Sequence, residues 1–422
     1  MVLSGAALDT SLHVDGERTK GLLLALAEFG KNPEGGVSRL GFSPEEQAAR
    51  VWLVERMKEA GLDVWVDAAA NLHGRRAGAD PSLPAILFGS HIDSVPKGGN
   101  FDGDVGSMGA LEVMSTLRDE KATTRHRFEM VVWSNEEGVH YGKGIFGSRM
   151  AARGPDAGEL EAKDEDGVTL AEWLRRYGAD PGRIAEARLE PRRVASYIEL
   201  HIEQGGVLDR AGVQIGVVQG IVGIDRYHVT LEGFANHAGT TPMAERRDAL
   251  LAAARLIVAV REEVMARPGR QVGNVGYVQV QPGAPNVVPG LARLPVELRD
   301  LKREVIDDMA SRVRARAEAI AKEARVTFTM ERYATDEPAL TDPALQDLIE
   351  TAARGAGYST LRLPSGAGHD AQSLGQAGIP IGMIFVPSKG GISHSPRELT
   401  EWDDVTRGAE VLYRVLRALD AK

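Results

Sequence analysis

The chain lacks cysteine entirely, and only 5% of its 422 residues are aromatic. Without cysteine, neither disulfides nor thiolate metal sites can form, so any metal must be bound by His, Asp or Glu. No apolar stretch is long enough to cross a bilayer, which argues against a membrane protein. The amino terminus also lacks a basic segment followed by an apolar one, so we expect a cytoplasmic protein.

Positive charge is scarcer than negative charge. The sequence has 50 Lys and Arg against 60 Asp and Glu, which gives a net charge of -10 at pH 7. This acidic balance argues against a nucleic-acid-binding surface. The 26% charged and 43% hydrophobic residues are ordinary for a globular protein, and the length is sufficient for two domains.

Apolar periodicity predicts a large domain in which strands alternate with helices. The predicted strands span residues 64–66, 85–88, 128–133, 197–203 and 380–386. The predicted helices span residues 43–61, 106–118, 343–356 and 402–419. The first of these helices has the clearest start, because Ser43 can act as the N-cap, Pro44 lies in the first turn and Glu46 follows the cap by three residues. This order predicts an α/β domain.

A different order of elements occupies residues 212–333. Strands are predicted at residues 225–232, 274–280, 294–299 and 325–331, with helices at residues 246–265 and 302–323. The order βαββαβ is the ferredoxin-like pattern. We therefore predict a main domain built from residues 1–211 and 334–422, interrupted by an inserted α+β domain at residues 212–333.

Five possible metal ligands lie at separate points along the predicted main domain. They are His91, Asp102, Glu137, His201 and His394. Most of them follow predicted strands directly or through a short loop, so we expect them to converge at the carboxyl edge of the sheet. Nitrogen and carboxylate donors suit zinc, with manganese, cobalt or nickel as alternatives. Asp102 is the natural bridging carboxylate if two metals lie about 3.5 Å apart.

Two local patterns refine the predicted metal site. Residues 197–203 alternate strictly, so His201 faces the side opposite to the apolar residues of its strand. Asp93 follows His91 by two residues and is expected to accept the second imidazole N–H of that ligand.

Glu136 and Glu137 are adjacent and are expected to serve different functions, since neighbouring loop residues can point in different directions. One can bind metal while the other remains free. The free carboxylate would take a proton from a water made acidic by the metal and later give it to a leaving amine.

Each of these residues also has an ordinary structural interpretation. A His in a Gly-rich turn is usually structural, and a Glu-Glu dipeptide is usually a solvated surface pair. His201 alone could be a buried histidine whose hydrogen bonds are satisfied. The metal-site hypothesis depends on all five residues occurring together in Gly-rich surroundings.

The candidate residues lie in segments that resemble a known family. The segments are GSHIDSVPKGGNFDGDVG, SNEEG, GSRMAARG, ELHIEQGGVLD, FANHAGTTPMAERRDAL, PNVVPG, ELRD, SGAGHDAQSL and SHSPRE. They resemble the amidase/hydantoinase/carbamoylase branch of the M20 metallopeptidase clan, which includes N-carbamoyl-L-amino-acid hydrolases, β-ureidopropionases and allantoate amidohydrolases. HIEQG and NHAGTTPM separate this branch from the ordinary aminoacylases and dipeptidases of the clan.

The resemblance implies an α/β fold in two parts. The first is a zinc-peptidase-like catalytic domain with a mixed central sheet, and the second is an inserted α+β ferredoxin-like domain that acts as lid and dimer interface of a homodimer. It also implies two divalent metal ions per subunit, with zinc as the first candidate. His91, Asp102 and His201 would hold one metal, and Asp102, Glu137 and His394 would hold the other.

The resemblance also implies roles in the reaction. Glu136 would be the general acid and base. His237 would stabilise the oxyanion of the tetrahedral intermediate, although in this sequence it could equally be a loop histidine that caps a turn beside Gly239.

Five residues are implied to bind the substrate. Gln204 would hold the ureido group, and Gly368 and His369 would line the pocket. Asn286 and Arg299 would clamp the substrate carboxylate and reach the site of the partner subunit.

The clamp has alternatives in the sequence itself. Arg299 alternates with Leu298 at the end of a predicted strand, and Arg suits bidentate recognition of a carboxylate. From the residues alone, a weak surface salt bridge with Glu297 or Asp300 is the favoured interpretation. Asn286 could be only a turn residue.

The activity implied by the resemblance is metal-dependent hydrolysis of the linear carbamoyl C–N bond of N-carbamoyl-L-amino acids or related ureido acids. The substrate would be a small anion, and the products would be an amino acid, ammonia and carbon dioxide. Allantoate and N-acyl amino acids are alternative substrates, and a metal-binding dimer that has lost catalysis is an alternative of another class. His140 stands where many relatives have Arg, so the preferred substrate side chain stays open.

Overall fold

The computed structural model describes residues 10–421, which form two compact units. The larger unit comprises the chain up to Gly220 and again from Leu340, and the inserted unit spans Ile221–Ala339. The sequence had placed the insert at residues 212–333. The amino-terminal residues 1–9, to which the prediction of no secretory signal refers, lie outside the described range.

The larger unit contains a nine-stranded mixed sheet of order β1-β2-β4-β3-β5-β16-β6-β14, with β15 beside β6. The strands are β1 Asp63–Val66, β2 Leu72–Arg76, β3 Ala85–His91, β4 Phe128–Trp133, β5 Val194–Ile202, β6 Ile215–Ile221, β14 Ala339–Leu340, β15 Thr360–Ser365 and β16 Ile381–Val386. The central strands β4, β3, β5 and β16 are parallel, whereas β2 and β6 join them antiparallel. The mixed central sheet is the fold class that the sequence predicted.

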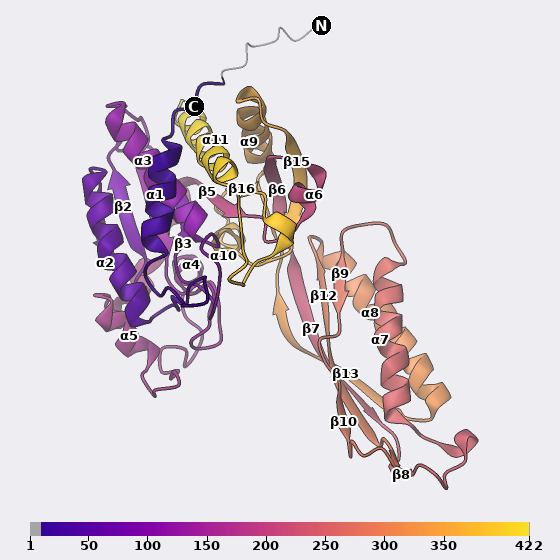
Figure 1. Ribbon diagram of the computed structural model, residues 1–422. Helices are drawn as coiled ribbons and strands as arrows, with labels where there is room; N and C mark the ends of the chain where they lie inside the picture. Colours follow the sequence, from indigo (N-terminus) through magenta and orange to yellow (C-terminus); the bar gives the residue numbers. More distant parts are fainter. Residues whose placement is uncertain (1–9, 422) are drawn as a thin grey trace, which may run out of the picture. The chain divides into compact units, whose positions relative to one another are not determined.

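Helices cover both faces of this sheet (Figure 1). They are α1 Gly16–Leu26, α2 Pro44–Glu59, α3 Asp104–Asp119, α4 Phe146–Ala152, α5 Leu170–Arg176, α6 Val207–Ala211, α9 Pro343–Gly355, α10 Asp370–Gln376 and α11 Trp402–Asp420. Ile198 and Leu200 of β5 lie in the core with residues of α3 and α11. Glu199 points the other way, where its carboxylate accepts the backbone N–H of Ala371 in α10. The alternation predicted for β5 therefore separates a packed face from a polar face.

The start of α2 follows the predicted capping pattern. The Ser43 hydroxyl accepts the backbone N–H of Glu46 at 3.2 Å, and the Glu46 carboxylate accepts the backbone N–H of Phe42 at 2.8 Å. The first bond satisfies an N–H that the first helical turn leaves without an intrahelical partner, and the second ties Glu46 to the N–H of Phe42, the residue before the N-cap.

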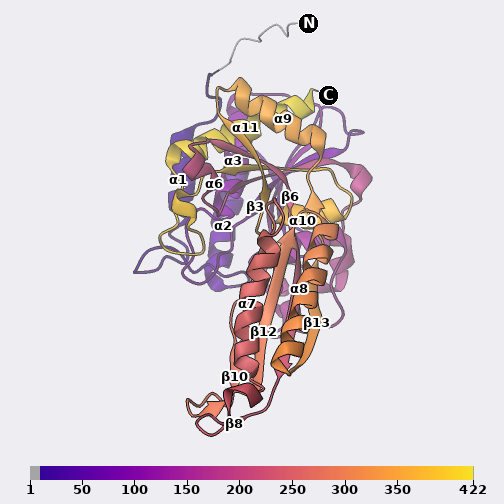
Figure 2. The same cartoon turned by 90° about the vertical axis from the view of Figure 1, so that its right-hand side faces the viewer.

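The inserted unit has a five-stranded sheet of order β10-β12-β7-β13, with β9 beside β12 and two helices on one face (Figure 2). Its main elements are β7 Gly223–Glu232, α7 Ala249–Met265, β9 Val272–Asn274, β10 Gln279–Gln281, β12 Leu291–Asp300, α8 Arg303–Ala324 and β13 Thr327–Asp336. The predicted strand at residues 274–280 is in fact two short strands that pair with different parts of β12. A separate two-stranded ribbon joins β8 Asn236–His237 to β11 Val287–Val288.

The described residues 10–421 include no helix that is both long enough and apolar enough to cross a membrane.

A buried histidine joins β2 to its neighbours in the larger unit. His73 is 4% exposed, and its Nδ1 lies 3.0 Å from the Glu129 carboxylate while its Nε2 lies 3.3 Å from the Asp67 carboxylate. Trp65 stacks on the imidazole ring. Burial alone would favour the neutral ring, but the two carboxylates prevail and raise the pKa of His73 from 6.5 to about 9.

This arrangement predicts a pH-dependent contribution to stability. Because the folded-state pKa of His73 is raised, the contribution is fully present below pH 6.5 and is lost as the pH rises through 9. The pKa difference corresponds to about 3 kcal/mol in the free energy of unfolding. The free energies of unfolding of wild type and His73→Gln, measured in urea, should therefore differ most near pH 6. This difference should be about 3 kcal/mol smaller near pH 10. A difference that stays constant over this range would contradict the ionised state of His73.

Candidate metal centre

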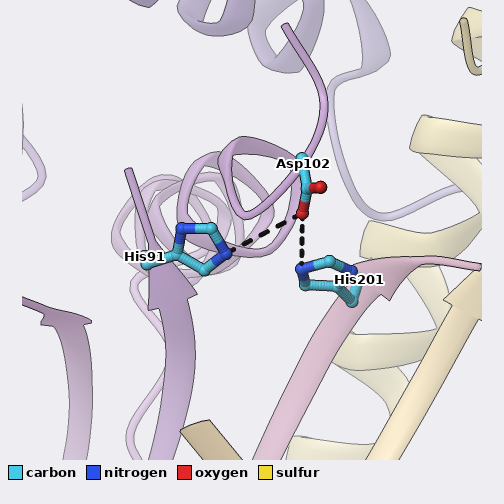
Figure 3. A group of neighbouring side chains, drawn as sticks. All are labelled: His91, Asp102 and His201. Atoms are coloured by element: carbon cyan, nitrogen blue, oxygen red, sulfur yellow. Dashed lines mark ion pairs between the residues drawn. The ribbon is translucent and has the colours of Figure 1, made fainter. Parts of the chain in front are cut away.

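The carboxyl ends of β3 and β5 bring two histidines to the same edge of the sheet. His91 is the last residue of β3 and is 2% exposed, and His201 in β5 is 1% exposed. Asp102 lies between them, with its Oδ1 3.1 Å from His201 Nε2 and 3.9 Å from His91 Nε2 (Figure 3). Parallel strands that end side by side are the usual position for a site in an α/β sheet.

Backbone carbonyls orient both imidazoles. The Nδ1 of His91 lies 3.0 Å from the carbonyl oxygen of Asp93, and the Nδ1 of His201 lies 2.9 Å from that of Ile202. A proton on each Nδ1 satisfies these contacts and leaves the Nε2 lone pairs directed at Asp102, as metal ligands require. The carboxylate of Asp93 had been expected to take this N–H, but it lies 3.5 Å from Nδ1 and has other partners.

The turn before α3 can only be built with a small residue. Gly103 has φ +67°, and a Cβ at this position would lie 2.4 Å from the imidazole of His91. Glycine therefore permits both the left-handed turn and the close approach of the Asp102 loop to His91.

A second group of donors shares Asp102. The Nε2 of His394 lies 3.2 Å from Asp102 Oδ2 and 3.6 Å from Glu137 Oε2. Oxygen Oε1 of Glu137 is buried and has no hydrogen-bond partner within residues 10–421. The structure thus brings together His91, Asp102 and His201 in one group and Asp102, Glu137 and His394 in another, with the donor atoms of each group within 4.8 Å of one another.

The charges of this cluster favour cations. Burial, reinforced by the Asp102 carboxylate, raises the pKa of Glu137 to about 8. Burial opposes ionisation of Asp102 as well, yet in the metal-free protein the protonated forms of His201 and His394 donate to its carboxylate and hold its pKa well below the ordinary value. A metal ion would take the place of these Nε2 protons. Carboxylates crowded together away from water are stabilised in their charged form when divalent cations bind among them. The donor set therefore fits divalent metal ions that prefer nitrogen and oxygen ligands.

Glu136 lies beside the donor groups but belongs to neither. Its Oε2 is 3.8 Å from His91 Nε2, and its side chain is 11% exposed. Burial and neighbouring carboxylates raise the pKa of Glu136 well above its ordinary value, against the effect of His91. The carboxylate of Asp93 accepts the backbone N–H groups of Glu136 and Glu137, each at 3.0 Å, and so fixes the loop that presents both side chains.

A buried carboxylate that was not predicted from the sequence connects two loops of the site. Glu398 is 6% exposed, and its Oε1 accepts the backbone N–H groups of Phe101 and Asp102 at 3.0 and 3.1 Å. The single hydroxyl proton of Ser393 is shared between Glu398 Oε2 at 2.7 Å and Asp102 Oδ2 at 3.0 Å. Ser393 and Glu398 both belong to the SHSPRE segment, so the sequence motif marked this region. It did not indicate that Glu398 bonds to the backbone at residues 101 and 102.

His369 lies against the site without facing Asp102. It is 1% exposed, and its ring meets the ring of His201 edge-on with centroids 4.5 Å apart. Its Nε2 lies 2.8 Å from the Ser365 hydroxyl. With Glu199 and His201 it forms a third cluster of possible donors, but Glu199 already accepts hydrogen bonds from Ser90 and Ala371.

The neighbour Gly368 is exposed, and no close contact restricts the space where its Cβ would lie. Gln204 lies at the cluster itself. Its amide nitrogen donates to Asp102 Oδ2 at 2.7 Å, while its buried Oε1 has no partner among the described residues.

Two implied functional residues meet on the ribbon of the inserted unit. His237 is exposed, and its Nδ1 accepts the backbone N–H of Gly239 at 3.0 Å, which is the turn contact considered as the alternative. The carbonyl of Asn286 accepts the backbone N–H of Ala238 at 2.9 Å. His237 and Asn286 therefore belong to one local structure.

Arg299 lies at the other end of the inserted unit. It is the ninth residue of β12, whereas ribbon strand β11 lies just before the first residue of β12. Its guanidinium donates to Glu297 Oε1 at 2.8 Å, and Glu297 Oε2 accepts from Arg226, also at 2.8 Å. The salt bridge with Glu297 that the sequence suggested is thus present.

A mixed sheet with clustered His and carboxylate donors at its carboxyl edge, together with an inserted βαββαβ unit, defines an α/β protein with a candidate dinuclear metal centre. Residues 87–418 match peptidase family M20/M25/M40, and the chain belongs to this family. Family membership and the donor groups together support the binding of divalent metal.

Relatives extend over almost the whole chain. An N-carbamoyl-L-amino acid amidohydrolase of Geobacillus stearothermophilus is 44% identical over 403 residues, which cover 96% of this chain and 98% of the relative. An allantoate amidohydrolase of Bacillus subtilis is 32% identical and covers 93% of this chain and 95% of its own length. The crystal structure of an amidase of the hydantoinase/carbamoylase family from Burkholderia multivorans has a TM-score of 0.92 and 36% identity, covering 97% and 98% of the two chains.

Proposed function

We propose that this protein hydrolyses the carbamoyl C–N bond of N-carbamoyl-L-amino acids and releases an amino acid, ammonia and carbon dioxide. The observation that carries this proposal is the 44% identity, over 96% of the chain, to an N-carbamoyl-L-amino acid amidohydrolase. The five clustered donors and the adjacent Glu136 supply the residues that such a reaction needs. The proposed location is the cytoplasm, and cell fractionation tests it.

The proposed cofactor is a pair of divalent cations, with zinc first and manganese, cobalt or nickel as alternatives. His91, Asp102 and His201 would hold one ion, and Glu137 and His394 would hold the other together with Asp102. Bound cations of this kind polarise an amide carbonyl and make water acidic enough to react near neutral pH.

The chain itself handles the proton and the substrate in this proposal. Glu136 takes a proton from the attacking water and returns it to the leaving nitrogen, for which a carboxylate with a raised pKa is suited. Gln204 holds the ureido group through its unpartnered Oε1, which can accept an N–H of that group. Gly368 and His369 line the pocket, and His237 donates to the developing oxyanion.

The substrate clamp leads to a proposal about assembly. Leu291 and Arg299 are eight steps of extended strand apart, which separates the two ends of β12 by about 26 Å. A small substrate cannot span this distance, so the arrangement implied by the resemblance, in which Asn286 and Arg299 of one subunit both reach the partner's site, is replaced in this proposal. Arg299 and the pair of His237 and Asn286 can serve the same site only when they come from different subunits. We therefore include a homodimer formed through the inserted unit in the proposal.

Arg299→Ala is expected to lower kcat/KM for a carboxylate substrate by about 10- to 150-fold, because a hydrogen-bonded charge pair contributes about 1.5–3 kcal/mol. The carboxamide analogue of the same substrate should be affected much less. Arg226→Ala is the matched control, since it removes the other arginine that pairs with Glu297. Equal effects of the two substitutions would mean that Arg299 serves only the salt bridge.

Mixing the Arg299→Ala and His237→Ala proteins under conditions of subunit exchange extends this test. If the two residues serve one site from different subunits, a mixed dimer contains one intact site, and activity should rise above that of either variant. If the mixture were only as active as the two variants measured separately, the site would not be shared between subunits. The effect of Arg299→Ala alone would still stand.

Ammonia release from a panel of substrates tests the function itself. The panel contains N-carbamoyl, N-formyl and N-acyl amino acids and allantoate, with metal restored after chelation. Highest kcat/KM on N-carbamoyl-L-amino acids is expected. Calorimetric binding of ureido acids without any turnover would favour a metal-binding dimer that has lost catalysis.

A second candidate is allantoate hydrolysis, which the 32% identity to an allantoate amidohydrolase favours. The same panel separates the two, because the second candidate requires allantoate to exceed every N-carbamoyl amino acid in kcat/KM.

A further inference from the structure

We propose that Asn71 is a positioning residue that holds the loop carrying Glu136 and Glu137 in its working geometry. This inference rests on the proposed function for its catalytic consequence, although its effect on metal binding can be measured separately. Asn71 is fully buried in the turn between β1 and β2, and it belongs to neither donor group.

The loop in question closes on itself. The backbone N–H of Gly147 donates to the carbonyl of Ser134 at 2.8 Å, and that of Ile145 donates to the carbonyl of Glu136 at 2.6 Å. Residues 134–147 therefore leave the end of β4 and return to the same place at the start of α4. Glu136 lies within the paired base of the loop, so a shift of the base moves its carboxylate.

Asn71 joins the two ends of this base with one amide group. Its Oδ1 accepts the backbone N–H of Ser134 at 3.1 Å, and its Nδ2 donates to the carbonyl of Gly147 at 3.2 Å. Ser134 precedes Glu136 by two residues and adjoins Asn135, which has φ +50°. Since a non-glycine residue with positive φ depends on its surroundings to hold it, a fixed Ser134 also stabilises the turn into Glu136.

The orientation of the Asn71 amide is itself determined by a carboxylate. Asp67 Oδ2 accepts Asn71 Nδ2 at 2.9 Å, and Asp67 Oδ1 accepts the backbone N–H groups of Ala69 and Asn71, each at 2.8 Å. Because an ionised carboxylate only accepts hydrogen bonds, the amide nitrogen must face Asp67 and the amide oxygen must face Ser134. The Nε2 of His73 lies 3.3 Å from Asp67 Oδ2 and helps to hold this carboxylate in place.

Close packing at the loop base gives independent support. A Cβ on Gly147 would lie 2.0 Å from Asn71 Oδ1 and 2.6 Å from the backbone nitrogen of Ser134. The space beside the amide is therefore too small for an added methyl group. Gly147→Ala should break the hydrogen bonds of Asn71 to Ser134 and Gly147 while leaving the Asn71 side chain in the sequence. On its other side the loop is held by Asp93, so loss of Asn71 is expected to weaken the geometry rather than remove the loop.

The test compares Asn71→Ala, Asn71→Asp and Gly147→Ala with wild type in the full-length, metal-loaded protein. All three are expected to lower kcat for an N-carbamoyl amino acid by about 10- to 100-fold, as loss of an outer-layer partner usually does, with KM nearly unchanged. Zinc affinity, measured by titration of the chelated protein, should also fall because Glu137 shifts with the loop. Asn71→Asp keeps an acceptor for Ser134 but sets a second carboxylate oxygen against Asp67 Oδ2, so it should lose at least as much activity as Asn71→Ala.

Trp65→Leu is the matched control. It disturbs the same hairpin through the ring that stacks on His73, but it touches neither end of the loop. Near wild-type kcat and zinc affinity in a folded Asn71→Ala or Gly147→Ala protein would overturn the proposal, as would equal losses in Trp65→Leu. If the wild-type protein released no ammonia from any substrate, the proposed function would fail, and zinc affinity would still decide the role of Asn71.

Discussion

Glu136→Gln is expected to lower kcat by about 100- to 10,000-fold, the usual contribution of a positioned proton-transfer group. Glutamine keeps the size of the side chain and can donate hydrogen bonds, but it cannot accept a proton from water near neutral pH. Metal content, measured by elemental mass spectrometry, should stay at the wild-type value because Glu136 lies outside both donor groups.

The neighbouring residue supplies the control for this substitution. Glu137→Gln should lower both metal content and turnover, since Glu137 lies within 4.8 Å of the other donors of its group and has a buried oxygen without a partner in the described chain. The two adjacent variants are thus expected to differ in metal content. Turnover near the wild-type rate in Glu136→Gln would refute its assignment as the general acid and base.

Asp102→Ala is expected to lower the affinity for both cations by at least about 100-fold. Losing a partner that only hydrogen-bonds a metal ligand costs about 10- to 100-fold, and losing a ligand itself should cost more. Asp102 is the one residue common to the two donor groups, and its oxygens lie 3.1 Å from His201 and 3.2 Å from His394. Zinc titration followed by calorimetry should find no tight site in this variant, and ammonia release should fall with metal content.

His394→Ala is the comparison that gives this prediction its specificity. His394 belongs to one donor group only, so the variant should retain one tight zinc ion while the Asp102→Ala protein retains none. Loss of a single ion in Asp102→Ala would indicate that the carboxylate does not bridge the two positions.

The strands and the donors could be predicted because their signals are local. The alternation of β5 places Glu199 and His201 on the face opposite to Ile198 and Leu200, and the structure has this arrangement. The two helices and the three long strands of the inserted unit were likewise predicted from periodicity, whereas the single strand expected at 274–280 is two short strands and the ribbon of β8 and β11 was not predicted. Strand β6, which pairs with β16 at the far side of the central strands, was assigned to the insert because pairing partners leave no mark on local periodicity.

The supporting contacts of the site could not be predicted, because they join residues that are distant in sequence. Glu398 accepts the backbone N–H of Asp102 from 296 positions away, and Asn71 bonds to Ser134 across 63 positions. Asp93 was expected to bond an imidazole, yet the fold directs its carboxylate to the backbone of Glu136 and Glu137. Such partners depend on how strands and loops meet, which composition and spacing do not determine.

Anomalous diffraction from crystals grown with excess zinc would locate the bound ions. Two peaks about 3.5 Å apart are expected, one beside His91 and His201 and one beside Glu137 and His394, with Asp102 between them. Peaks confined to other positions, such as the cluster of Glu199, His201 and His369, or no peak near Asp102 at saturating zinc, would contradict the dinuclear centre.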